Sequence, residues 1–116
     1  MALISNRTGW FLVGWLVAGA SYASQPSSTE MLAFAKSKAC LGCHQVDARR
    51  VGPSFTLIAD RHAGQQGAEE YLASAIRQGG RGRWGAVPMP AQPQVSEADA
   101  KRLAQWILTL KPATPK

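Results

Sequence analysis

The chain has 116 residues, of which 46% are hydrophobic. This is the length and composition of one small globular domain, which excludes a disordered chain and a multidomain protein. Thirteen Lys and Arg against seven Asp and Glu give a formal net charge of +6, which favours acidic partner surfaces. No nucleic-acid-binding motif accompanies this charge, and we expect no nucleic-acid partner.

The N-terminus has the pattern of an export signal. A basic residue precedes an apolar run over residues 10–20, and small residues stand at positions 21 and 23, where signal peptidase reads them. The run is shorter than the about 18–20 residues that span a bilayer, which disfavours the alternative of an uncleaved membrane anchor. We expect a signal peptide over residues 1–23, cleaved after Ala23, and one domain over residues 24–116.

The first half of this domain predicts one helix and one short helical turn. Ser27-x-x-Glu30 has the pattern of a capping box, and the helix that it opens extends to about Ala39. A short helical turn is expected over residues 56–61. The apolar side of the first helix carries Met31, Leu32, Phe34 and Ala35.

The second half predicts two longer helices with a loop between them. One follows Gly67 and ends at Gly79-Gly80, and the other begins at Ser96, with Asp99 at the capping-box position. Residues 79–95 between them hold four glycines and three prolines, which exclude a regular element, so another surface must hold this loop. The predicted apolar stripes are Tyr71, Leu72, Ala75 and Ile76 in the first of these helices and Leu103, Trp106, Ile107 and Leu110 in the second.

The two cysteines of the chain lie in one motif, Cys40-Leu41-Gly42-Cys43-His44. Cys-x-x-Cys-His is the sequence on which haem is covalently attached, because two thiols at this spacing can add to the two vinyl groups of one porphyrin. The imidazole of His44 is then placed to bind the iron. A redox-active Cys40–Cys43 disulfide is the alternative, and the adjacent histidine argues against it.

Haem iron that is closed to outside molecules needs a second axial ligand. The candidates in the mature chain are His62, Met31 and Met89. We favour Met89, because the flanking prolines of Val87-Pro88-Met89-Pro90 fix the backbone and present the weakly binding thioether rigidly. His62 is expected to be an exposed surface histidine. Ligation by His44 and Met89 favours reduced iron and raises the potential relative to two histidines.

With these motifs, the chain resembles the bacterial monohaem class I cytochromes c of the c-551 (cytochrome c8) type over about residues 29–111. The resemblance implies an all-α fold with three main helices and loops wrapped around one covalently bound haem c, attached through Cys40 and Cys43. The landmarks in order are Phe34, the haem motif, Val51-Gly52-Pro53, the run from Gly82 to Pro90, and the segment from Val95 to Ile107.

The resemblance also implies roles for individual side chains. Pro53 is expected to accept a hydrogen bond from His44, the alternative being that Gly52-Pro53 is only a turn. The indole N–H of Trp84 is expected to bond a haem propionate, the alternative being an apolar lid. In the helices, Phe34 and Trp106 are expected to meet.

Two positions depart from the family pattern. Gln92 stands where members often have an asparagine that bonds the methionine sulfur, and Ala75 stands where they often have a basic residue near a propionate. Arg77 or Arg81 could substitute for the latter. The resemblance therefore leaves the redox potential open.

The function implied is that of a monomeric periplasmic electron carrier rather than an enzyme. Its expected partners are a quinol-oxidising complex upstream and a terminal oxidase, peroxidase or nitrite reductase downstream, with membrane contact only through such complexes. Candidate docking residues, which could equally form an ordinary solvated face, are Lys36, Lys38, Arg49, Arg50, Arg77, Arg81 and Arg83.

Two other classes of function compete with this one. A gas sensor or peroxidase needs an open sixth position and a distal acid–base pair, for which His62 is the only spare imidazole. A site without haem would bind zinc through Cys40, Cys43, His44 and His62, or would act as a thiol redox centre in a βαβ context that the sequence lacks.

Overall fold

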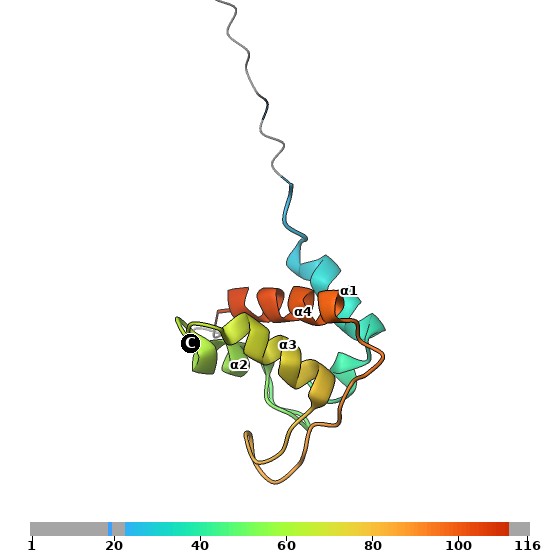
Figure 1. Ribbon diagram of the computed structural model, residues 1–116, viewed down its shortest axis with the longest axis vertical. Coiled ribbons are helices and arrows are strands. Elements are labelled where there is room, and N and C mark those ends of the chain that lie inside the picture. The colour runs from blue at the N-terminus through green and yellow to red at the C-terminus, as the bar shows by residue number, and fades with distance from the viewer. Residues whose placement is uncertain (1–18, 20–22, 112–116) are drawn as a thin grey trace, which may run out of the picture.

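The computed structural model describes Gly19 and residues 23–111. Apart from Gly19 and Ala23, the predicted signal peptide lies outside the described residues. No helix in the described part is both long enough and apolar enough to cross a membrane. That part contains four α-helices and one 3-10 turn, and its only extended pairing is an isolated bridge. The elements are α1 (Ser28–Ser37), η1 (Cys40–Gly42), α2 (Phe55–His62), α3 (Ala68–Gln78) and α4 (Glu97–Thr109) (Figure 1).

Both predicted N-terminal caps are present, but they differ in how they are completed. The backbone N–H of Ser27 donates to Glu30 Oε2 at 2.7 Å and that of Glu30 donates to Ser27 Oγ at 3.3 Å, which closes the capping box of α1. Ser96 caps α4 by accepting from the N–H of Asp99 at 3.1 Å. The carboxylate of Asp99, however, pairs with Nζ of Lys38 at 2.6 Å, so it ties the end of α1 to the start of α4.

The helical turn expected over residues 56–61 is a helix of eight residues, α2. Its N-terminal cap is Ser54, whose hydroxyl accepts a hydrogen bond from the N–H of Leu57 at 3.1 Å. A serine directly after a proline is a local sequence signal that could have predicted this helix start. The helix continues to His62, which extends it past the expected end by one residue.

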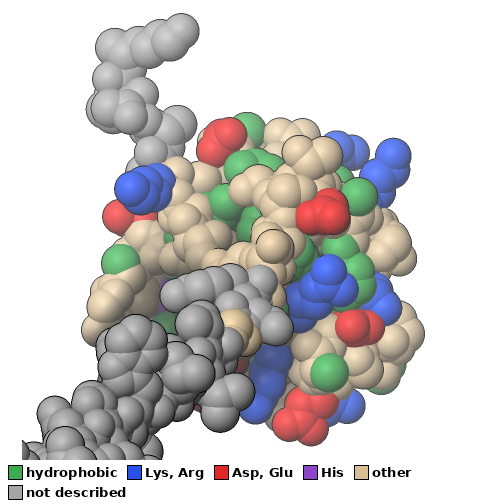
Figure 2. Space-filling model, turned by 90° about the horizontal axis from the view of Figure 1, so that it is seen from above, with side chains coloured by type: hydrophobic (Ala, Val, Ile, Leu, Met, Phe, Trp, Pro, Cys, Tyr) green, Lys and Arg blue, Asp and Glu red, His purple; other side chains and the backbone are tan. Residues whose placement is uncertain are grey.

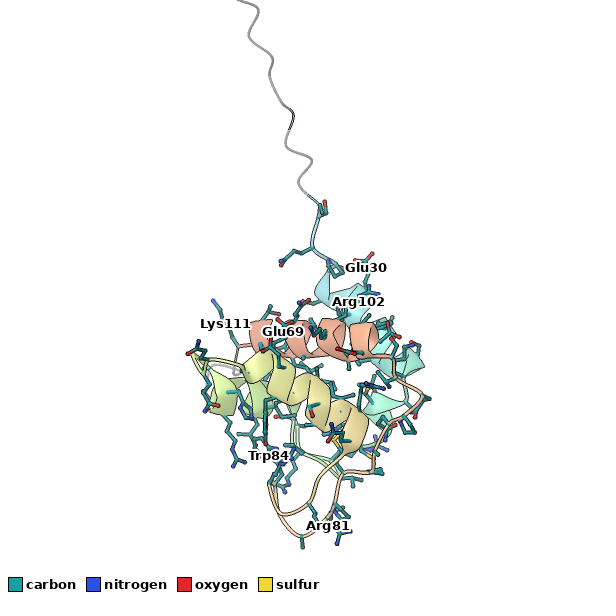
Figure 3. The ribbon with its side chains drawn as sticks, viewed as in Figure 1. Glu30, Glu69, Arg81, Trp84, Arg102 and Lys111 are labelled. Atoms are coloured by element: carbon teal, nitrogen blue, oxygen red, sulfur yellow. The ribbon has the colours of Figure 1, made fainter. Side chains whose placement is uncertain are left out.

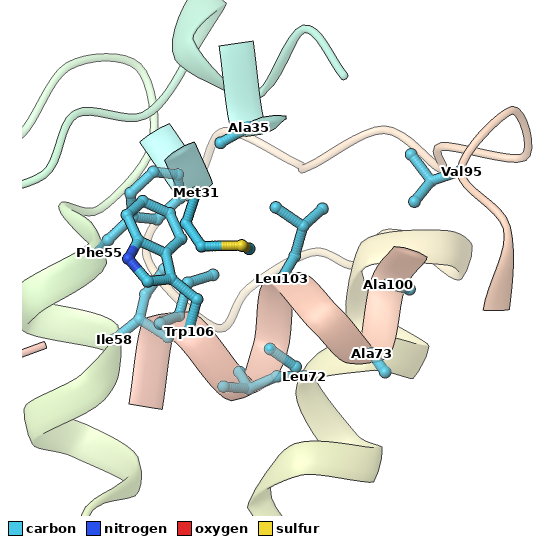
Figure 4. Close-up of a cluster of buried hydrophobic side chains, with 12 residues drawn as sticks. Met31, Ala35, Phe55, Ile58, Leu72, Ala73, Val95, Ala100, Leu103 and Trp106 are labelled. Carbon is cyan, nitrogen blue, oxygen red and sulfur yellow. The ribbon is translucent and has the colours of Figure 1, made fainter. Parts of the chain in front are cut away.

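The core lies where α4 packs against the other three α-helices (Figure 4). Met31, Val95 and Leu103 are its largest fully buried side chains. The ring of Phe55 meets Trp106 edge to face at 5.4 Å and stacks on the imidazole of His44, also at 5.4 Å. The core of α4 is therefore continuous, through two aromatic rings, with the histidine of the haem motif.

The expected meeting of Phe34 and Trp106 remains a prediction. Phe34 packs at the edge of the core, where the guanidinium of Arg102 lies 4.4 Å from its ring centroid. The aromatic partner of Trp106 is Phe55, and the indole nitrogen of Trp106 has no hydrogen-bond partner among the described residues.

Candidate functional site

An open cavity lies between α2, α3, α4 and the loop that follows α3. Its empty volume, counted to the mouth, is about 1300 Å³. The structure brings all six residues predicted for the site to the wall of this one cavity: Cys40, Cys43, His44, Pro53, Trp84 and Met89.

Burial, a hydrogen bond and a stacked aromatic ring fix the position of the His44 side chain. It is 8% exposed, and its Nδ1 lies 2.7 Å from the carbonyl oxygen of Pro53. A carbonyl oxygen only accepts, so Nδ1 carries the proton and Nε2 keeps a lone pair for a metal. The predicted hydrogen bond between His44 and Pro53 is therefore present, and Phe55 stacks on the ring.

Gly52 makes this placement of the imidazole possible. A Cβ atom at residue 52 would lie 2.6 Å from Cε1 and 2.9 Å from Nδ1 of His44. The backbone there is fixed, because the N–H of Gly52 donates to the carbonyl of Cys43 at 2.8 Å. Sequence reasoning treated this glycine only as part of a turn, and its close approach to the ring could not be read from the chain.

The two cysteines are free thiols, with Cys40 at the first position of the turn η1 and Cys43 directly after its end. Cys40 is half-buried, and burial raises the pKa of its thiol, while Cys43 is exposed. The N–H of His44 donates to the carbonyl of Cys40 at 3.0 Å, and the three residues of the motif, Cys40, Cys43 and His44, border the same cavity. Among the described residues, no group of three or more His, Cys, Asp or Glu side chains is placed to hold a metal ion, which gives the zinc alternative no support.

Met89 borders the cavity from the loop after α3 and is held by its backbone. Its N–H donates to the carbonyl of Gly80 at 2.8 Å, and its carbonyl accepts from the N–H of Gly80 at 3.0 Å. Gly79, at φ +69°, ends α3 directly behind this bridge, and a Cβ there would run into the carbonyl oxygen of Met89. The Gly79-Gly80 pair was assigned only to helix capping, but it also fixes the position of Met89.

The structure separates the other two candidate ligands. Met31 is 1% exposed in the core, does not border the cavity, and points its thioether toward Leu103 (Figure 4). His62 does border the cavity and is only partly exposed, so the expectation of an exposed surface histidine was wrong. Its Nδ1 pairs with Oε1 of Gln65 at 2.9 Å, and its ring lies 5.1 Å from that of Tyr71.

The apolar stripe predicted for α3 borders the cavity as well as the protein core, because Leu72 belongs to the core and Ile76 packs against it. Tyr71 is 43% exposed, and Ala75 and Ile76 are only partly buried, although the periodicity predicts burial. An apolar helix face left against an empty volume indicates an apolar group that fills it. With two thiols and an imidazole from one segment and a thioether from another at the same cavity, these walls fit a haem. The cavity-facing residues of the two long helices are Tyr71, Leu72, Ala75, Ile76, Leu103 and Ile107.

The loop after α3 carries Trp84 and Arg81 at the end of the molecule away from α1 (Figure 3). The indole of Trp84 is half-buried at the cavity wall, with the guanidinium of Arg61 at 4.4 Å from the ring centroid.

Gln92, which departs from the family pattern, lies further along the same loop. Its side-chain amide donates a hydrogen bond to the carbonyl of Pro90 at 3.2 Å, within its own loop.

Several of the basic residues proposed for docking already have partners inside the protein. Lys38 pairs with Asp99, Arg49 donates to the carbonyl of Trp84, Arg77 donates to that of Val95, and Arg83 lies over the ring of Tyr71. Basic and acidic side chains are interspersed on the face shown in Figure 2. Within the described part of the chain, no side-chain hydrogen bond or ion pair is formed by Lys36, Arg50 or Arg81.

Residues 32–111 match the cytochrome c family. The chain is 47% identical to cytochrome c-552 of Hydrogenobacter thermophilus over 96 residues, which are 83% of this chain and 95% of the relative. It is 51% identical to cytochrome c-551 of Azotobacter vinelandii over 76 residues, which are 66% of this chain and 92% of the relative. The crystal structure of Nitrosomonas europaea cytochrome c552 matches with a TM-score of 0.68 and 49% identity, covering 69% of this chain and 99% of that chain.

The cavity has apolar walls, an imidazole whose Nε2 keeps its lone pair and two thiols, and the relatives most similar among those compared above are named as cytochromes c. The haem-free site considered from the sequence is therefore wrong. The protein transfers electrons and works with redox protein partners. The chain belongs to the cytochrome c family, as a monohaem class I cytochrome of the c-551 type with one haem c attached covalently through Cys40 and Cys43.

Proposed function

We propose that the protein is a periplasmic carrier of single electrons, not an enzyme, and that His44 and Met89 are the axial ligands of its haem. When bound, the haem supplies an iron that cycles between ferric and ferrous states. The observation that carries the proposal is that an imidazole and a thioether border one cavity from two different segments of the chain.

The imidazole of His44 is suited to permanent ligation. Pro53 holds the proton on Nδ1, so the lone pair of Nε2 is directed away from that hydrogen bond and is available to a metal. The hydrogen bond also increases the basicity of the ligand and fixes the ring. Burial at 8% exposure means that His44 cannot leave its position without disturbing Phe55 and the core.

The thioether of Met89 is a weaker ligand, so its support has to come from the chain. Two backbone hydrogen bonds to Gly80 and a proline on each side restrict the residue. A soft ligand held in this way stabilises reduced iron and closes the sixth position to outside molecules. Closure without a nearby acid–base pair suits electron transfer better than catalysis or sensing.

Trp84 and Pro53 complete the proposed haem-binding set. The indole N–H of Trp84 forms no hydrogen bond within the described part of the protein, and the side chain borders the cavity. It is therefore free to donate to a carboxylate of the cofactor, which is the role that we propose for it. Neither residue has a proposed role in chemistry beyond binding and positioning.

The rest of the proposal concerns where the protein works and with what. Residues 1–23 act as a signal peptide, cleaved after Ala23, and residues 24–116 form a monomeric carrier domain in the periplasm. A quinol-oxidising complex supplies the electron, and a terminal oxidase, peroxidase or nitrite reductase accepts it. At the cavity mouth, Val51 (51% exposed) and Val87 (62% exposed) lie on a rim that also carries Arg81, which suits transient contact with an acidic partner surface.

The test is the visible spectrum of protein matured with haem in a periplasm, recorded oxidised and reduced, with and without carbon monoxide. We expect a low-spin ferrous spectrum that is indifferent to carbon monoxide, and binding of carbon monoxide after Met89→Ala. His62→Ala is the matched control, because His62 borders the same cavity. Its spectrum should remain that of the unchanged protein.

Two outcomes would contradict the proposal. Prompt binding of carbon monoxide by the unchanged protein would mean an open sixth position and would favour a sensor or peroxidase. Carbon monoxide binding by His62→Ala but not by Met89→Ala would make His62 the sixth ligand.

A further inference from the structure

Two arginines from separate segments hold the loop that precedes Met89. Nη2 of Arg49 donates to the carbonyl of Trp84 at 2.8 Å, and Nη1 of Arg61 donates to the carbonyl of Arg83 at 2.6 Å. We call these two residues the arginine clasp. The clasp ties two successive peptide groups of the loop to the segment before α2 and to α2 itself.

Aromatic contacts reinforce the clasp. The guanidinium of Arg61 lies 4.4 Å from the ring centroid of Trp84, so one side chain binds both the backbone and the indole of the loop. The guanidinium of Arg83 in turn lies 5.1 Å from the ring centroid of Tyr71 on α3. A cation over an aromatic ring at an exposed site is worth about 0.5–1 kcal/mol.

The middle of this loop has no other hydrogen-bonded support in the described structure. The bridge between Gly80 and Met89 fastens its two ends, but residues 81–88 form no backbone–backbone hydrogen bond. Segments of this kind open locally at a lower free energy than the core. Whatever holds residues 83 and 84 therefore controls how often the loop leaves the cavity.

We propose that Arg49 and Arg61 are positioning residues that keep this loop closed and so retain Met89 at the sixth position. The proposal rests on Met89 being the axial ligand, as set out above. Because a guanidinium stays charged in proteins, the clasp does not loosen with pH. It acts on the retention of the ligand, while the hydrogen bond to Pro53 and the packing of Phe55 act separately on His44.

The experiment measures the rate at which added imidazole binds to the ferric holoprotein, by stopped-flow absorbance. We expect Arg61→Ala to raise this rate about tenfold, because it loses a hydrogen bond and a cation–ring contact together. Arg49→Ala, which loses only the hydrogen bond, should raise the rate about threefold. Arg61→Lys keeps the charge but not the planar donor pair, and should lie between Arg61→Ala and the unchanged protein.

Two variants serve as matched controls. Arg50→Ala removes a positive charge next to Arg49 that forms no side-chain hydrogen bond or ion pair among the described residues. Arg102→Ala removes a guanidinium that also lies 4.4 Å from an aromatic ring, that of Phe34, but on α4 and away from Trp84 (Figure 3). Both should bind imidazole within about twofold of the unchanged protein.

The outcomes distinguish the clasp from the ligand assignment. If Arg49→Ala and Arg61→Ala bind imidazole no faster than Arg50→Ala and Arg102→Ala, the clasp is wrong and Met89 can still be the ligand. The clasp is also wrong if the imidazole-binding rates of all the variants simply correlate with their urea unfolding midpoints, because the effect would then come from global stability and not from the loop. If the unchanged protein binds as fast as Met89→Ala, the ligand assignment itself fails.

Discussion

The two sides of the cavity support their candidate ligands in different ways. His44 is 8% exposed, hydrogen-bonded to Pro53 at 2.7 Å and stacked on a core phenylalanine, so its position depends on the folded core. Met89 is half-buried on a loop and is held by hydrogen bonds of its main chain to Gly80. As the proposed ligand on its side, His44 should be lost only when the core opens, whereas Met89 should be released by a local movement of its loop.

The largest effect is expected from a change behind Met89. Gly79→Ala should destabilise the holoprotein by about 3 kcal/mol, because it combines a left-handed backbone with a collision against the Met89 carbonyl. Urea unfolding measures the loss, and the charge-transfer band of methionine-bound ferric haem should weaken. Gly82→Ala is the matched control.

Gly82 has φ +74° in the same loop, and a Cβ there would meet nothing within 4 Å. Gly82→Ala should therefore cost only about 1 kcal/mol and leave the charge-transfer band intact. Equal effects of the two substitutions would show that backbone strain alone matters and that the contact with Met89 does not.

A second substitution tests the opposite side of the cavity. Gly52→Ala places a Cβ 2.6 Å from the imidazole of His44 and should cost about 2 kcal/mol. We expect a shift of the redox potential, measured by voltammetry, with the methionine band retained. Gly42→Ala, where a Cβ would meet nothing within 4 Å, should change neither quantity. Loss of the methionine band in Gly52→Ala would mean that the two sides are not independent.

A substitution at Ala39 is expected to have a smaller effect on the free energy of unfolding, and to stabilise the protein instead of destabilising it. Ala39 is the only non-glycine residue with positive φ in the described chain, at +64°, and it directly precedes Cys40. Ala39→Gly should stabilise the holoprotein by about 0.5–1 kcal/mol, since the relief of strain exceeds the added freedom of the unfolded chain. Urea unfolding is again the measurement. Ala33→Gly, at an exposed helical position of α1, should destabilise the protein by about 1 kcal/mol.

The smallest effect is expected at the ion pair between α1 and α4, which is outside both ligand sides. The hydrogen bond from Lys38 holds the pKa of Asp99 below its ordinary value. A lowered folded-state pKa gives stability that is present above the unfolded-state pKa and is lost as pH falls through the folded-state value. Asp99→Asn should therefore lower the stability slightly at neutral pH, and this difference should disappear as pH falls below the folded-state pKa of Asp99, as followed by thermal unfolding, with the haem spectra unchanged. A stability difference that persists undiminished in acid would contradict this.

Much of the fold was predictable, because its signals are local. The capping box of Ser27 and Glu30 and the stop at Gly79 are present as expected. The sequence predicted α2 to be shorter than it is. Its N-terminal cap, Ser54, directly follows Pro53, which was interpreted as part of a loop. Asp99 shows the limit of local reasoning. The sequence predicted a capping role within α4, but its carboxylate forms an ion pair with Lys38 at the end of α1.

The candidate site was predictable as a set of residues but not as an arrangement. Periodicity identified the apolar face of α3, but not that this face borders a cavity. The same reasoning placed His62 at the surface, although the fold carries it to the cavity wall. Gly79 was assigned to capping alone, because a close approach to Met89 depends on where the loop returns.

The sequence by itself determined the haem motif, the helical elements and the short list of candidate ligands, since all of these depend on spacings of a few residues. Only the tertiary structure decided that Met31 is a core residue while Met89 and His62 border the cavity. It alone also decided which arginines hold the loop, because those hydrogen bonds join residues 22 and 35 positions apart. Contacts at such separations depend on how the helices pack, and no local pattern encodes them.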